Sequence, residues 1–181
     1  MVYIILGKGF EPMEAIAPCD ILRRGGAEVR FAGIGGTLIE GGHGISVQAD
    51  CTVEQMKLAD TDMVLLPGGL GGVHSILASE TAMNFIRLAY EKNYHDRGYL
   101  CCADHSCVDF TSPDGRKATC YPGMEDQMGT AQMIPCGAVQ DGNVITGRAA
   151  GSADEFGLAC LRALKGEDTA RQVAADIVYR A

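Results

Sequence analysis

Hydrophobic residues along the chain fall into short, unbroken apolar runs separated by longer amphipathic segments. Unbroken runs are typical of strands buried on both faces of a parallel sheet, and apolar residues at helical spacing indicate the covering helices. We expect strands at residues 2–6, 27–33, 62–66, 117–121 and 143–146, another ending within 100–103, and a hairpin of 37–40 and 45–48. We expect helices between residues 11 and 25 and at 53–58, 81–91, 154–164 and 169–179. This alternation predicts an α/β fold with a mostly parallel central sheet.

The stretch from Asp62 to Gly72 is the one around which we expect the chain to be organised. Its apolar run is stopped by Pro67 and by the pair Gly68-Gly69, which indicates a buried strand that ends in a tight glycine turn. Ligands of open α/β sheets bind beyond the carboxyl ends of the strands, where glycines can expose backbone N–H groups. A plain strand-to-helix turn is the alternative. Glu14 after the first strand and the cysteines after residue 100 favour a functional site.

Length and charge limit the classes of protein to be considered. The 181 residues predict a single domain spanning residues 1–181, with enough chain to bury a substantial core. The net charge of −8 argues against nucleic acid or an anionic membrane surface as the main partner. No apolar run has the length of a transmembrane helix, and Met1 leads into a strand rather than a signal segment. We therefore expect a cytoplasmic protein that binds neither nucleic acid nor membrane.

Eight cysteines are spread over the chain, namely Cys19, Cys51, Cys101, Cys102, Cys107, Cys120, Cys136 and Cys160. In a chain of this length without an export signal, we expect them to be reduced. Most are then small buried side chains, with one reactive thiol among them. Their spacing to one another and to the histidines is not that of zinc ligands, so we expect no metal site.

Four motifs make the chain similar to the ThiJ/PfpI superfamily, and most similar to its branch of the parkinsonism-associated deglycase. The similarity runs from residue 2 to the end, with matching order and spacing. The motifs are Leu6-Gly-Lys-Gly-Phe-Glu-Pro-Met-Glu14, Asp20-Ile-Leu-Arg-Arg-Gly-Gly, Leu66-Pro-Gly-Gly69 and Gly147-Arg-Ala-Ala-Gly-Ser152 followed by Glu155-Phe156. The resemblance implies a flavodoxin-like three-layer sandwich, usually a homodimer, with a nucleophilic cysteine on a sharp strand-to-helix elbow.

The resemblance also implies roles for particular residues. Glu14 is implied to contact the cysteine, and backbone amides of the turn at Gly68 and Gly69 are implied to form an oxyanion hole with the residue after the cysteine. No metal and no organic cofactor is implied. The activity implied first is that of a glyoxalase or deglycase, whose substrate is a small α-oxoaldehyde or its protein adduct. The alternatives are a redox sensor or chaperone whose cysteine is oxidised to a sulfinate, and an amidotransferase-like hydrolase.

The chemistry expected of such a pair follows from its parts. The thiolate is the nucleophilic form of cysteine, and the N-terminus of a helix stabilises that anion. A carboxyl group such as that of Glu14, in a partly dry crevice, can stay protonated and donate a hydrogen bond to the sulfur. The alternative for Glu14 is an exposed acid that complements the dipole of its helix.

The predicted elbow departs from the family pattern. The family has a sequence close to Ala-Ile-Cys-Ala-Ala-Pro-Thr, whereas this chain has Gly98-Tyr-Leu-Cys-Cys-Ala-Asp-His-Ser-Cys107. The candidate nucleophile is Cys101 or Cys102, and the spacing to the next Asp-Gly-Arg favours Cys101. His105 is a candidate general base, with a solvated side chain as the alternative. Tyr121 stands where several members carry a histidine partner for the cysteine, and is a candidate auxiliary residue.

A displaced reading frame explains this departure. When the codons from Arg97 to Cys107 are read one nucleotide out of frame, synonymous codons can be chosen that encode the family elbow. The displaced sequence is then Ala-Ala-Ile-Cys-Ala-Ala-Pro-Thr-Thr-Leu-Ala, and Ile is equally allowed at either Thr. The third nucleotide of each original codon was chosen among synonymous codons to obtain this match. The other two nucleotides of each displaced codon are set by the amino-acid sequence. The family cysteine then arises across Leu100 and Cys101. We hypothesise that residues 93–113 are frame-displaced and that the frame is restored before Asp114.

Intact-mass measurement of the protein made from its natural gene tests this hypothesis. Burying Asp104 and His105 without partners beside a sheet covered on both faces costs several kcal/mol, on the order of a small domain's whole stability. We therefore expect one of two outcomes. Either the elbow near residues 100–102 is intact and the intact mass differs from that of the 181 residues, or residues 93–113 are genuine, loop outward and take the thiol away from Glu14. A mass equal to that of the 181 residues, with hydrogen-bond partners for both side chains in an ordered elbow, contradicts the hypothesis.

Overall fold

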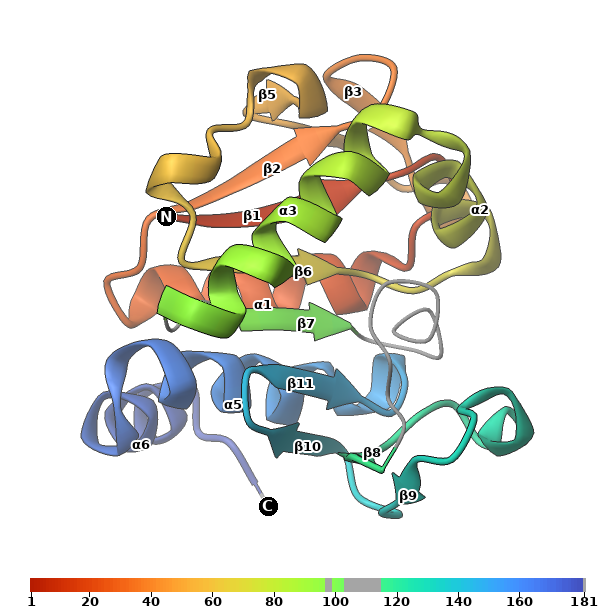
Figure 1. The fold of residues 1–181 in the computed structure, drawn as a ribbon. Coiled ribbons are helices and arrows are strands. Elements are labelled where there is room, and N and C mark those ends of the chain that lie inside the picture. The colour runs from red at the N-terminus through yellow and green to blue at the C-terminus, as the bar shows by residue number, and fades with distance from the viewer. Residues whose placement is uncertain (97–98, 103–114, 181) are drawn as a thin grey trace.

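The central sheet has the strand order β10-β11-β7-β6-β1-β2-β5 within the residues that the computed structural model describes, 1–96, 99–102 and 115–180 (Figure 1). Its strands are β1 (Val2–Leu6), β2 (Val29–Gly33), β5 (Cys51–Thr52), β6 (Met63–Leu66), β7 (Tyr99–Cys102), β10 (Ala138–Asp141) and β11 (Val144–Gly147). Neighbouring strands are parallel except β10 and β11, which pair antiparallel at one edge. Strand β6 occupies the middle of the sheet, as predicted.

Helices cover both faces of this sheet. One face packs against α1 (Pro12–Arg24), α5 (Ala153–Lys165) and α6 (Glu167–Asp176). The other packs against α2 (Leu70–Ala78), α3 (Glu80–Asp96) and the 3₁₀ turn η2 (Val53–Gln55). Along β1 the side chains alternate between the two cores, since Ile4 belongs to the first and Tyr3 and Ile5 to the second. Figure 1 shows α3 crossing one face and α1 on the other. The predicted flavodoxin-like α/β sandwich is confirmed.

Two small sheets lie outside the central one. The predicted hairpin forms from β3 (Leu38–Glu40) and β4 (Ser46–Gln48), which flank η1 (Gly42–Gly44), but it is a sheet of its own and not an extension of the main sheet. The second pairs β8 (Lys117–Ala118) with β9 (Gln132–Met133). The remaining 3₁₀ turns are η3 (Leu58–Asp60), η4 (Glu125–Gln127) and η5 (Ala150–Ser152).

Two predicted elements are wrong in kind or extent. Residues 53–58 form no continuous helix, because Met56 is extended (φ −64°, ψ 146°) and separates η2 from η3. The strand predicted at 117–121 ends at Ala118, because Thr119 turns to other partners: its N–H donates to Thr146 Oγ1 at 2.9 Å and its hydroxyl to the Cys136 carbonyl at 2.9 Å. Helix α2 and strands β5, β9 and β10 were not predicted.

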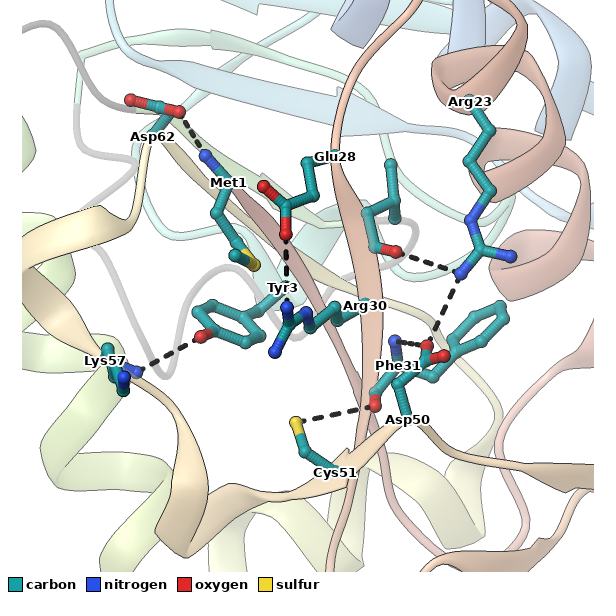
Figure 2. A network of polar contacts seen from close by, with 11 residues as sticks. Met1, Tyr3, Arg23, Glu28, Arg30, Phe31, Asp50, Cys51, Lys57 and Asp62 are labelled. Carbon is teal, nitrogen blue, oxygen red and sulfur yellow. Dashed lines mark hydrogen bonds and ion pairs between the residues drawn. The ribbon is translucent and has the colours of Figure 1, made fainter.

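A polar network fastens the last turn of α1 to the sheet (Figure 2). The carboxylate of Asp50 accepts the N–H of Phe31 at 2.8 Å and a guanidinium N–H of Arg23 at 3.4 Å. The same guanidinium donates to the Val29 carbonyl at 2.9 Å. These bonds hold the carboxyl end of α1 in place, and the site described below holds its amino end.

Candidate active site

The start of α1 places Glu14 in the interior. Glu11 is the N-cap and accepts the Met13 N–H at 3.2 Å, and Pro12 takes the first helical position, where its missing N–H is harmless. Glu14 follows in the first turn with only 5% of its surface exposed. Its Oε2 accepts the Gly68 N–H at 2.8 Å. Glu14 is therefore not the exposed first-turn acid considered as the alternative, because it links α1 to the glycine turn after β6.

The glycine turn after β6 packs directly on the loop after β1. The Glu11 N–H donates to the Gly68 carbonyl at 2.8 Å, and Gly69 has a φ of +87°. A Cβ on Gly69 would lie 2.6 Å from the Gly9 carbonyl oxygen and 2.7 Å from the Glu11 nitrogen. Gly69 is required both by its backbone conformation and by this close approach.

The two predicted oxyanion-hole amides differ in their bonding. The Gly68 N–H is engaged by Glu14. Gly69 caps the N-terminus of α2, and its carbonyl accepts the Val73 N–H at 3.0 Å. Of the two, the Gly69 N–H is therefore the better candidate to bind a ligand oxygen, and Gly68 positions Glu14.

Strand β7 brings the candidate cysteines to this edge of the sheet. The backbone of Cys101 pairs with Leu65 and that of Cys102 with Leu66, two residues before Gly68. The Cys102 side chain is fully buried in the core that also holds Leu66. A thiol excluded from water is a poor nucleophile, so Cys101 is the better of the two candidates. The side chain of Cys101 and residues 103–114, His105 among them, lie outside the described residues.

A cavity of about 360 Å³ lies beside Glu14 and Gly69. Its described lining consists of Glu11, Glu14, Gly69, Leu70, Tyr121, Met124 and Ala150. Two hollows of about 740 and 680 Å³ lie elsewhere, one between η2 and α3 and one beside α1 and the last residues of the chain, and neither is lined by the glycine turn. The smaller cavity combines a buried carboxyl group with a glycine turn at the carboxyl end of the central strand. It is our candidate active site.

The predicted auxiliary residue Tyr121 lies at the rim of this cavity. Its side chain is 54% exposed, and the Met124 N–H donates to its carbonyl at 3.1 Å, so one turn presents both side chains to the cavity. Sequence reasoning did not predict the four lining residues Glu11, Leu70, Met124 and Ala150. Glu11 and Ala150 lie in quoted motifs, whereas no pattern marks Met124.

The described residues contain neither a metal cluster nor a membrane span. Among them, no group of three or more His, Cys, Asp or Glu side chains is placed to hold a metal ion. None of the helices in this part of the chain is both long and apolar enough to cross a membrane.

Two buried thiols outside the site are expected to resist oxidation. Burial raises the pKa of Cys19 to about 11 and also raises the pKa of Cys51, whose Sγ donates to the Phe31 carbonyl at 3.7 Å (Figure 2). At pH 8, roughly one Cys19 thiol in a thousand is then a thiolate, the form that peroxide attacks. Mild peroxide should convert one elbow cysteine, Cys101 or Cys102, to sulfinate well before Cys19 or Cys51. Peptide mass spectrometry measures the order, with urea-unfolded protein as the control. Equal oxidation of all these cysteines in the folded protein would contradict a tuned site.

Known proteins resemble the chain over most of its length. It is 34% identical over 177 residues to Protein DJ-1 homolog A of Arabidopsis thaliana, which covers 95% of this chain and 44% of that protein. The chain thus spans less than half the length of this relative, and likewise 41% of the plant's homolog B. It is 32% identical over 174 residues to Protein dj-1beta of Drosophila melanogaster, which covers 94% of this chain and 92% of that one.

A further relative and a solved structure extend the comparison. The chain is 29% identical over 149 residues to a deglycase of Pyrococcus horikoshii, which covers 81% of this chain and 89% of that protein. The crystal structure of Drosophila melanogaster DJ-1beta matches with a TM-score of 0.88 and 28% identity, over 99% of this chain and 98% of that one. The model of the DJ-1/PfpI family matches residues 1–163. The chain belongs to the DJ-1/PfpI family.

Proposed function

We propose that the chain is a cysteine-dependent enzyme of the glyoxalase or deglycase type, acting on reactive α-oxoaldehydes or their protein adducts. The observation that carries the proposal is Glu14, a buried carboxyl group that lines a cavity with Gly69 at the edge where β7 ends. The relative from Pyrococcus horikoshii that is named a deglycase supports the same class of chemistry.

The first step of the proposed reaction is addition. The elbow thiolate attacks the aldehyde carbon, a C–S bond forms, and the aldehyde oxygen becomes an oxyanion. Gly69 lines the cavity, and its N–H is the proposed donor to that oxygen, since a preorganised donor stabilises such a charge. Glu14 gives its proton to the oxyanion, which yields a hemithioacetal and leaves Glu14 as a carboxylate.

The second step moves one proton between neighbouring carbons. As a carboxylate, Glu14 takes the proton from the former aldehyde carbon, and the electron pair forms the C=C bond of an enediol as the ketone oxygen picks up a proton. Glu14 then returns its proton to the adjacent carbon while the hydroxyl on the former aldehyde carbon loses one, so the protons on the two oxygens also balance. The aldehyde carbon is thereby oxidised to a thioester and the ketone carbon is reduced to an alcohol, so no external oxidant is needed. Water then cleaves the thioester, which releases lactate from methylglyoxal and restores the thiol.

Lactate formation tests the proposal. A sample of verified intact mass is incubated with methylglyoxal without added thiol cofactor, and lactate is measured by an enzyme-coupled assay. We expect turnover that depends on protein concentration. If no lactate forms while peroxide still oxidises a single elbow cysteine to sulfinate, the glyoxalase proposal is wrong and the redox-sensor alternative is favoured.

A further inference from the structure

The described lining of the cavity contains acidic side chains and no basic one. Two acids, Glu11 and Glu14, and no Lys, Arg or His are among the described residues that line it. Because Glu14 is assigned a protonated state as the donor to the sulfur, Glu11 is the residue that brings negative charge. His43 Nε2 lies 4.0 Å from Glu11 Oε2, but this ring is 83% exposed and does not line the cavity. A ligand in this cavity therefore meets negative charge with no cation among the described lining residues to offset it.

The rest of the described lining is largely apolar. Leu70, Tyr121 and Met124 line the cavity, and Leu70 is 65% exposed. The turn that joins Tyr121 to Met124 is closed by the bond from the Met124 N–H to the Tyr121 carbonyl, so both residues line the cavity from one turn. A volume of about 360 Å³ admits a substituent as large as a phenyl ring beside these side chains.

We propose that this cavity selects uncharged α-oxoaldehydes with an apolar substituent and rejects anionic ones, with Glu11, Tyr121 and Met124 as specificity-determining residues. The proposal rests on the proposed function, because it concerns the same site. An anionic group near Glu11 meets like charge in a partly buried place, where the repulsion is only partly screened. An apolar substituent instead leaves water for contacts with Tyr121 and Met124.

A matched pair of substrates tests the charge selection. 4-Methylphenylglyoxal and 4-carboxyphenylglyoxal have the same aryl body and differ in charge. We expect kcat/KM to be roughly tenfold or more higher for the methyl compound in low salt, and the ratio to shrink as salt is added. Equal kcat/KM for the two compounds would overturn the proposal.

Substitution of Glu11 assigns the effect to this residue. Glu11→Gln keeps a side-chain oxygen to cap Met13 while it removes the charge, so the ratio of the two kcat/KM values should fall by roughly threefold or more. Glu91→Gln changes the net charge equally at an exposed position on α3, and should leave the ratio as in the wild type. A ratio unchanged by Glu11→Gln overturns the role of Glu11.

Substitution of Tyr121 tests the preference of the cavity for an apolar substituent. Tyr121→Ala should reduce the preference for phenylglyoxal over methylglyoxal by roughly five- to tenfold, since the ring loses its contact. Tyr121→Phe should keep the preference, because the apolar face of the side chain remains. An unchanged preference in Tyr121→Ala contradicts its assignment.

Alkylation separates this proposal from the proposed function. If no α-oxoaldehyde is turned over, the proposed function fails, and charge selection is then measured with neutral iodoacetamide against anionic iodoacetate at the elbow cysteine. Each rate is divided by the rate of the same reagent with 2-mercaptoethanol, which removes the intrinsic difference in reactivity between the two reagents. We expect iodoacetamide to react roughly tenfold faster after this correction, with a smaller ratio in Glu11→Gln. Equal corrected rates in the wild type overturn the charge selection whatever the reaction proves to be.

Discussion

Glu14→Gln is expected to lower kcat/KM for methylglyoxal by roughly 10²–10⁴-fold and to leave the pH midpoint of iodoacetamide labelling at the elbow cysteine nearly unchanged. The glutamine amide keeps an oxygen that can accept the Gly68 N–H, which Glu14 now accepts at 2.8 Å. It also keeps an N–H that can donate to the sulfur, as Glu14 is proposed to do. It cannot take a proton from the substrate and return it, which is the step assigned to Glu14.

Glu14→Ala separates the two roles of this side chain. It removes both the proposed donor to the sulfur and the acceptor for Gly68, so the labelling midpoint should rise in addition to the loss of turnover. The buried Gly68 N–H is then left without its partner, which costs about 1–3 kcal/mol of unfolding free energy. Glu54→Gln, at an exposed position on η2, is the control for both measurements. Full turnover in Glu14→Gln removes Glu14 from proton transfer, and an unchanged midpoint in Glu14→Ala removes it from thiolate stabilisation.

Gly69→Ala is expected to destabilise the fold by about 2–4 kcal/mol more than Gly166→Ala does. The two glycines have nearly the same φ, +87° and +90°, and neither conformation suits an alanine. They differ in their surroundings, because a Cβ on Gly69 would lie 2.6 Å from the Gly9 carbonyl oxygen, whereas a Cβ on Gly166 meets no atom within 4 Å. The difference between the two variants therefore isolates the close approach of the two loops.

Urea unfolding of the three proteins measures this difference, and the lactate assay follows its effect on the site. Relief of the clash has to move the loop after β6 away from the loop after β1, which shifts the Gly69 N–H and weakens the hold on Glu14. We therefore expect Gly69→Ala to lose turnover while Gly166→Ala keeps it. Equal loss of stability in the two variants would show that the loops are not packed as described.

The central part of the fold and site could be predicted because local and tertiary preferences agree there. The unbroken apolar run before Pro67 has the composition of a buried strand, and β6 stands in the middle of the sheet. The Glu-Pro-Met-Glu start of α1 carries its own capping signals, so the position of Glu14 in a first helical turn followed from the sequence. Its burial did not, because an acid at that position is as suited to solvent as to a cavity.

The parts that could not be predicted depend on contacts between distant segments. Helix α2 begins Leu-Gly-Gly, a poor helix former, and its Gly72 instead packs against Phe10. Strand β10 has only a short alternating pattern and is set by pairing with β11. Met124 reaches the cavity only because a turn brings it beside Tyr121. The sequence near each of these residues contains no pattern that predicts such contacts.

Stoichiometric blocking of the elbow thiol tests the cysteine-dependent activity most directly. Protein of verified mass is titrated with iodoacetamide at a pH where Cys19, with its pKa of about 11, stays protonated. Lactate turnover and the labelled fraction of each cysteine are measured in the same samples. We predict that turnover falls in proportion to labelling of one elbow cysteine and reaches zero when that residue is fully modified. Full turnover with both Cys101 and Cys102 completely labelled would contradict the proposed function.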